Sequence, residues 1–80
     1  MEVTAKQLRA IVGDNIRVRR QELGLTQVAL GEACGCSHVH VSMMERGKTE
    51  PSLTLLAALA EALSTNPQAL LSPEIFSPAA

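Results

Sequence analysis

Four residues able to ligate a metal ion alternate along one short stretch of the chain: Cys34, Cys36, His38 and His40. Zinc accepts thiolate and imidazole ligands of this kind. Alternate residues share a face only on an extended strand, whereas on a helix the two histidines lie about 200° apart. The spacing therefore argues against a metal site, and we expect neither a metal ion nor a cofactor. Cys34 is instead predicted to be a small core residue and Cys36 an ordinary turn residue.

Covalent chemistry at these residues is a second hypothesis. A catalytic cysteine needs an oriented base and a pocket, and a chain of 80 residues with regular helical patterns does not supply both. We therefore expect no enzymatic activity. Redox sensing through Cys36 stays open as an alternative, although no neighbour in the sequence favours its thiolate.

These residues lie at the junction of two short predicted helices. Thr26 is placed to cap a helix over 26–34 that Gly35 ends, and Ser37 is placed to cap a helix over 37–46. Two short helices joined by a glycine-containing turn have the shape of a helix-turn-helix, a motif that binds DNA.

The two faces of the second of these helices differ in character. At about 100° per residue, Val41 and Met44 point inward. The opposite face carries His38, Val39, Ser42 and Met43. Imidazole and hydroxyl groups can exchange hydrogen bonds with base edges, and the two apolar side chains can contact a thymine methyl. None of the four is an Arg, Asn or Gln, so DNA shape and backbone contacts are expected to carry a larger share of recognition.

The rest of the chain is also predicted to be helical. Thr4 and Gln7 have the spacing of a capping box for a helix over 4–23. A helix over 52–63 and a short one over 67–71 follow; the apolar face of the first comprises Leu53, Leu56, Leu59, Ala60 and Leu63. Residues 73–80 are expected to form a C-terminal tail. The sequence thus predicts an all-α, compact five-helix domain over residues 1–72.

Length and composition limit the classes of protein. Eighty residues support one domain, and a chain that is 46% hydrophobic with one aromatic residue favours packed helices over a sheet. No apolar stretch approaches the roughly 18 residues that cross a bilayer. Two cysteines one residue apart do not form the framework of a small secreted domain. We therefore expect a cytoplasmic protein with no membrane association.

The net charge of −1 is low for a DNA-binding protein, but the charges are unevenly distributed. All seven Lys and Arg residues lie from Lys6 to Lys48, and the only charges from Thr49 onward are three glutamates. Such asymmetry is expected if one face of the molecule meets phosphate groups.

One set of residues, which spans about Ile16 to Leu71, has a recognisable pattern: Leu23-Gly24-Leu25-Thr26-Gln27, Leu30, Gly35, Val41, Met44-Glu45-Arg46-Gly47-Lys48 and Pro51-Ser52-Leu53. In these residues the sequence resembles the lambda repressor and Cro (XRE) family of helix-turn-helix transcriptional regulators. It departs from the family pattern at Ala29, Gly31 and Ser64, where the family often has Glu, Ala and Gly.

The resemblance implies roles for individual residues. The predicted helix over 37–46 matches the family's recognition helix, which lies in the major groove. Base reading is implied for its outward residues: His38, Val39, Ser42 and Met43. Phosphate contacts are implied for Gln27, Ser37, Arg46, Lys48 and Thr49. Arg17, which belongs to a cluster of arginines, is either a phosphate contact or a solvated side chain. Arg20 and Glu45 match a family pair that bridges the first helix to the end of the recognition helix.

The family's docking geometry implies a homodimer that reads double-stranded DNA in the major groove at a palindromic operator. The expected function is that of a repressor or autoregulator. The alternative is an antitoxin that binds a toxin and autoregulates, and a scaffold that has lost DNA binding is a third possibility. Five apolar residues either complete the core or, in part, form the dimer surface: Leu55, Leu70, Leu71, Ile75 and Phe76.

Overall fold

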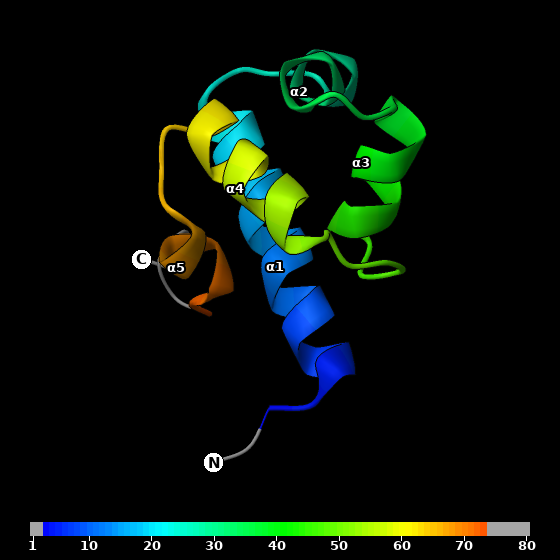
Figure 1. Ribbon diagram of the computed structural model, residues 1–80, viewed down its shortest axis with the longest axis vertical. Coiled ribbons are helices and arrows are strands. Elements are labelled where there is room, and N and C mark those ends of the chain that lie inside the picture. The colour runs from blue at the N-terminus through cyan, green and yellow to red at the C-terminus, as the bar shows by residue number, and fades with distance from the viewer. Residues whose placement is uncertain (1–2, 74–80) are drawn as a thin grey trace.

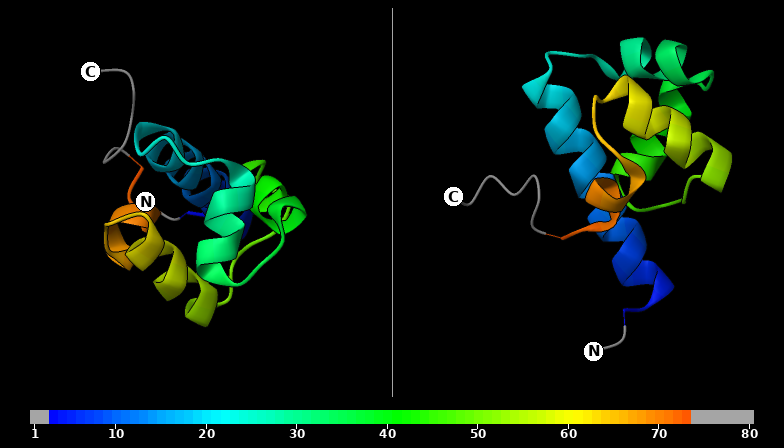
Figure 2. Two further views of the ribbon diagram at one scale, coloured as in Figure 1. Left: turned by 90° about the horizontal axis from the view of Figure 1, so that it is seen from above. Right: turned by 60° about the vertical axis from the view of Figure 1, so that its left-hand side comes forward.

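Five helices make up the part of the chain that the computed structural model describes, residues 3–73. They are α1 (Ala5–Glu22), α2 (Gln27–Cys34), α3 (His38–Glu45), α4 (Leu53–Ala62) and α5 (Pro67–Leu71). Helices α2 and α3 lie on one side of α1 and α4, and α5 lies on the other side (Figure 1), an arrangement also visible from above in Figure 2. The prediction of an all-α, five-helix fold is confirmed.

Every helix begins at a side chain that satisfies an otherwise unpaired backbone N–H group. The capping residues are Thr4, Thr26, Ser37, Ser52 and Asn66, and each accepts a hydrogen bond from the N–H three residues on. At Thr4 the capping box is complete, because the side-chain oxygen Oε1 of Gln7 also accepts from the Thr4 N–H at 2.9 Å. Local sequence therefore determines where each helix starts.

A single apolar core joins the helices. Its buried members are Val12, Ile16, Leu30, Val41, Met44, Leu56, Leu59, Ala60, Leu63 and Leu70. Leu70 is fully buried in this core, so its assignment to a dimer surface was wrong. Ile75 and Phe76, the last two residues of that predicted surface, lie outside the described residues.

The prediction for Leu53 was also wrong. The sequence pattern placed this residue on the core face of α4, but in the structure it is 85% exposed. Periodicity assigns a residue to one face of a helix, but it does not reveal whether another element covers that end of the helix. Leu53 is the first residue of α4, and none of the described elements covers it. Among residues 3–73, no helix has the length and apolar character needed to cross a bilayer.

Two polar side chains of α1 hold the ends of other helices, and no sequence pattern predicted either contact. Asn15 is buried and its amide donates to the carbonyl oxygens of Leu70 (2.9 Å) and Ser72 (2.7 Å) at the end of α5. Arg19 Nε donates to the Leu63 carbonyl oxygen at 2.8 Å, at the end of α4. Because the last carbonyls of a helix lack partners within it, these contacts fasten α4 and α5 to α1.

Ser64, which follows α4, has a left-handed backbone conformation with φ of 55°. A side chain in this region is strained, and glycine is not. We expect Ser64→Gly to raise the free energy of unfolding by about 0.5 kcal/mol. The substitution relieves the backbone strain, and the larger conformational entropy of glycine in the unfolded chain offsets part of this gain. Urea denaturation followed by circular dichroism measures the change. Ser72→Gly is the control, because Ser72 has a φ of −92° and glycine at this position should only lower the free energy of unfolding. A loss of stability in Ser64→Gly would contradict the prediction.

Candidate nucleic-acid interface

The turn between α2 and α3 sets how these two helices meet. Gly35 ends α2 with φ of 79°, and the Cys36 N–H donates to the Gly31 carbonyl oxygen at 2.9 Å. A Cβ atom on Gly31 would lie 2.5 Å from the Cys36 carbonyl oxygen. Gly31, one of the departures from the family pattern, therefore permits a close approach of α2 to the turn. An alanine at this position would require the backbone of the turn to move.

The faces of α3 divide as the periodicity predicts. Val41 and Met44 are buried in the core, while Val39 is 55% exposed and His38 and Met43 are also exposed. Ser42 is half-buried. Within residues 3–73, no side chain of His38 or Ser42 makes a hydrogen bond or ion pair. The outward face of α3 is thus available for a partner.

A buried network of charged and polar groups holds α3 against α1 and α2. Arg20 Nε donates to Glu45 Oε2 at 2.6 Å and Arg20 Nη2 to Glu45 Oε1 at 3.1 Å, a bidentate pair. The Gln27 amide donates to Glu45 Oε1 at 3.1 Å, and Arg20 Nη1 donates to the Leu25 carbonyl oxygen at 2.8 Å. The Arg20 and Glu45 side chains are only 12% and 3% exposed. The bridge expected from the resemblance is formed, and it also fixes Gln27.

The end of α3 also rests directly on the α1 backbone. A Cβ atom on Gly13 would lie 2.8 Å from the Glu45 carbonyl oxygen and closer still to that of Met44. Gly13 is itself buried. The orientation of α3 is therefore set by a close helix–backbone contact in addition to the Arg20–Glu45 pair. Sequence reasoning missed Gly13, although a glycine inside a helical pattern is the available signal for such a contact.

The residues predicted to meet phosphate differ in their surroundings. Arg46 and Lys48, just after α3, are exposed, and within residues 3–73 their side chains have no hydrogen-bond or ion-pair partner. Thr49 is half-buried. Arg17 lies on α1 and pairs with Asp14 at 3.2 Å, which offsets its charge. Ser37 Oγ accepts from the His40 N–H at 3.1 Å and so caps α3.

The cysteines of the α2–α3 turn are both half-buried free thiols. Burial raises the pKa of the Cys34 thiol, and the nearby Cys36 raises it further. Burial also raises the pKa of the Cys36 thiol. Since the thiolate is the reactive form, neither environment activates a cysteine. Within residues 3–73, no three or more His, Cys, Asp or Glu side chains gather as a metal-binding group.

These pKa directions predict slow thiol alkylation. At neutral pH, both cysteines are expected to react with iodoacetamide more slowly than free cysteine, and their rates should keep rising at pH values where free cysteine has levelled off. The single variants Cys34→Ser and Cys36→Ser separate the two rates, and Cys36→Ser should shift the Cys34 profile to lower pH. Faster reaction than free cysteine at neutral pH would contradict the prediction and support redox sensing.

Comparison with known proteins identifies relatives for most of the chain. A family model described as helix-turn-helix (HTH_3) matches residues 16–70. The repressor protein C2 of Salmonella phage P22 is 42% identical over 65 residues, which are 81% of this chain and 30% of that protein. The HTH-type transcriptional regulator DicA of Escherichia coli K12 is 43% identical over 60 residues, 75% of this chain and 44% of that protein. Neither name is that of an enzyme.

The fold is similar to that of a solved DNA complex. The crystal structure of the P22 c2 repressor with a synthetic operator superposes with a TM-score of 0.75 at 43% identity, covering 79% of this chain and 96% of that one. The chain spans less than half the length of the two curated relatives above. The matched region contains α2, α3 and the turn between them. The chain belongs to the HTH_3 helix-turn-helix family of transcriptional regulators.

Proposed function

We propose that the chain is a sequence-specific DNA-binding regulator, a repressor or autoregulator, that inserts α3 into the major groove of operator DNA. The two faces of α3 carry the proposal. Its inward residues are buried in the core, and its outward side chains make no hydrogen bond or ion pair within residues 3–73. Arg46 and Lys48, whose side chains have no partner among the described residues, come directly after this helix. An exposed reading face beside unpaired cations suits a duplex.

The proposed contacts fall into two groups. Base edges meet the outward residues of α3, His38, Val39, Ser42 and Met43. Phosphates meet Arg46, Lys48 and Thr49, with Gln27 and Ser37 at the starts of α2 and α3. The Gln27 amide has two N–H hydrogens, of which Glu45 accepts one, so the other remains for a phosphate. We assign Arg17 a lesser role because Asp14 already pairs with it.

The regulator acts as a homodimer in this proposal, in the cytoplasm. A two-fold dimer presents two α3 helices to half-sites about one DNA turn apart, and the operator is then an inverted repeat. Of the described residues predicted for the dimer surface, Leu70 belongs to the core, Leu55 is half-buried and Leu71 is exposed.

The experiment that tests the proposal is selection of bound duplexes from a random library at two salt concentrations. We expect an enriched inverted repeat whose half-site centres lie about 10 base pairs apart. If no motif emerges and binding disappears at moderate salt, the proposal fails. Capture of a small basic partner would then favour the antitoxin alternative.

Two substitutions should separate base reading from phosphate binding. Val39→Ala removes apolar contact with a base, so discrimination at one position in each half-site should fall by about 1 kcal/mol. Lys48→Gln should weaken all duplexes about equally and lower the slope of log affinity against log salt by about 1 per subunit. Competition binding to the selected site and its single-base variants measures both. Identical base preferences for Val39→Ala and the natural chain would contradict the assignment of the reading face.

A further inference from the structure

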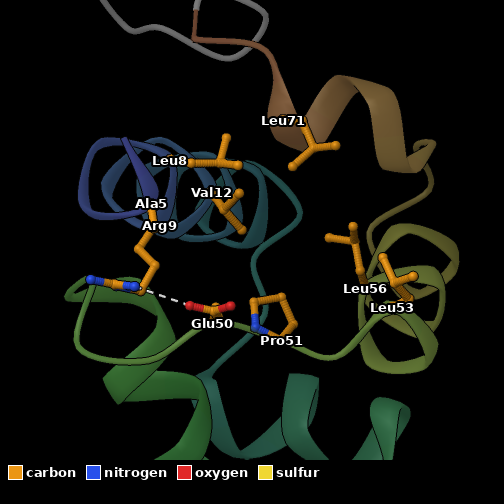
Figure 3. Close-up of a pocket in the computed structure, with 9 residues that line it drawn as sticks. All are labelled: Ala5, Leu8, Arg9, Val12, Glu50, Pro51, Leu53, Leu56 and Leu71. Carbon is orange, nitrogen blue, oxygen red and sulfur yellow. Dashed lines mark hydrogen bonds and ion pairs between the residues drawn. The ribbon is translucent and has the colours of Figure 1, made fainter. Parts of the chain in front are cut away.

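An apolar groove lies on the surface formed by α1, α4 and α5, with a cavity volume of about 260 Å³ (Figure 3). Its apolar lining includes Leu8, Val12, Pro51, Leu53, Leu56 and Leu71. At one edge, Arg9 Nη1 pairs with Glu50 Oε1 at 3.0 Å. No residue assigned above to DNA contact lines this groove.

Three leucines on the rim are left partly or largely exposed. Leu8 and Leu71 are each 38% exposed, and Leu53 is 85% exposed. A single exposed leucine is ordinary on a protein surface, but several leucines around one groove indicate a surface that another apolar group covers. Figure 3 shows Leu8, Leu53 and Leu71 on three different helices around the groove.

The chain itself carries an apolar segment within reach of this groove. Asn15 holds the Ser72 carbonyl oxygen at 2.7 Å, so the chain leaves α5 beside the middle of α1. From Asn15 to Leu8 the helix axis rises about 10 Å. Three or four residues of extended chain span about 10–13 Å. The segment from Ser72 to Ile75 and Phe76 is therefore long enough to reach the level of Leu8.

We propose that the groove binds the Ile75 and Phe76 side chains of the same chain. Its volume is below that of pockets for drug-sized ligands, so it suits one or two side chains. Phe76 is the only Phe, Tyr or Trp in the sequence, and Ile75 is its neighbour. This gives Ile75 and Phe76 an intramolecular role in place of a dimer contact.

Proton NMR of the full chain tests the contact directly, because only one residue contributes phenyl protons. We expect nuclear Overhauser effects from the Phe76 ring to the methyl groups of Leu8 and Leu53. Ring-current shifts of those methyls should be unchanged on dilution and should disappear in Phe76→Leu. Absence of these effects overturns the proposal. Effects seen only between labelled and unlabelled copies also overturn it, since the tail would then bind a second chain.

A double-mutant cycle in urea denaturation gives an independent readout. Leu53→Ala should lower the denaturation midpoint in the natural chain and leave it nearly unchanged in a Phe76→Ala background. Leu23→Ala is the control, because Leu23 is also an exposed leucine (39%) but does not line the groove; its effect should be the same in both backgrounds. An equal effect of Leu53→Ala in both backgrounds overturns the proposal. Neither experiment involves DNA, so the outcome is independent of the proposed function.

Discussion

Glu45→Ala is expected to lower the free energy of unfolding by about 3–5 kcal/mol, because it leaves a buried guanidinium without its counter-charge. In the folded chain, Arg20 and Gln27 both donate to the Glu45 carboxylate, and the Arg20 side chain is only 12% exposed. Without that carboxylate, the desolvation of Arg20 is no longer offset. Urea denaturation monitored by circular dichroism measures the loss.

The Arg9–Glu50 pair provides the control for this substitution. Its distance of 3.0 Å is similar, but the Glu50 side chain is 67% exposed. We therefore expect Glu50→Ala to change the free energy of unfolding by less than about 1 kcal/mol. Similar effects for Glu45→Ala and Glu50→Ala would show that water compensates for the loss of Glu45. The buried pair would then have no special weight in stability.

Gly13→Ala is expected to be the next most damaging change, with a net loss of about 2 kcal/mol in the free energy of unfolding. Alanine favours a helix over glycine by about 1 kcal/mol, so the substitution would be stabilising on an open helix face. Here the added methyl meets the carbonyl oxygens of Met44 and Glu45, which are backbone atoms and cannot rotate away. Either α3 moves away from α1 or the helix ends distort.

The neighbouring residue supplies the comparison for Gly13→Ala. Asp14 is exposed in the same helix, and its only described partner is Arg17 at 3.2 Å on the surface. Asp14→Ala should therefore change stability little. Gly13→Ala is also expected to weaken operator binding, since the displaced helix is the proposed reading helix. A Gly13→Ala chain as stable as the natural one would show that α1 and α3 separate at little cost.

Local patterns predicted most of the fold because helix ends depend on neighbouring residues. The caps at Thr26 and Ser37 and the left-handed Gly35 are read from three or four adjacent positions. The same holds for the inward and outward faces of α3, which follow from helical periodicity. The outward residues of the candidate site could therefore be named from the sequence.

Contacts between distant residues could not be predicted in this way. Asn15 and Leu70 are 55 positions apart, and no periodic pattern links an asparagine to the carbonyl oxygens at the end of another helix. Leu53 and Leu70 were misassigned for a related reason, because burial depends on which element covers a helix end. The Arg20–Glu45 pair was expected only through resemblance to a family.

The division of α3 into a fixed face and an outward face has an evolutionary consequence. Val41 and Met44 belong to the buried core, whereas the exposed side chains of Val39 and Met43 do not. Substitutions at the outward positions are therefore nearly neutral for folding. In the proposed function these positions read the operator. Duplicated copies of such a gene could then change operator preference one residue at a time and stop binding each other's sites, while each intermediate remains a folded protein.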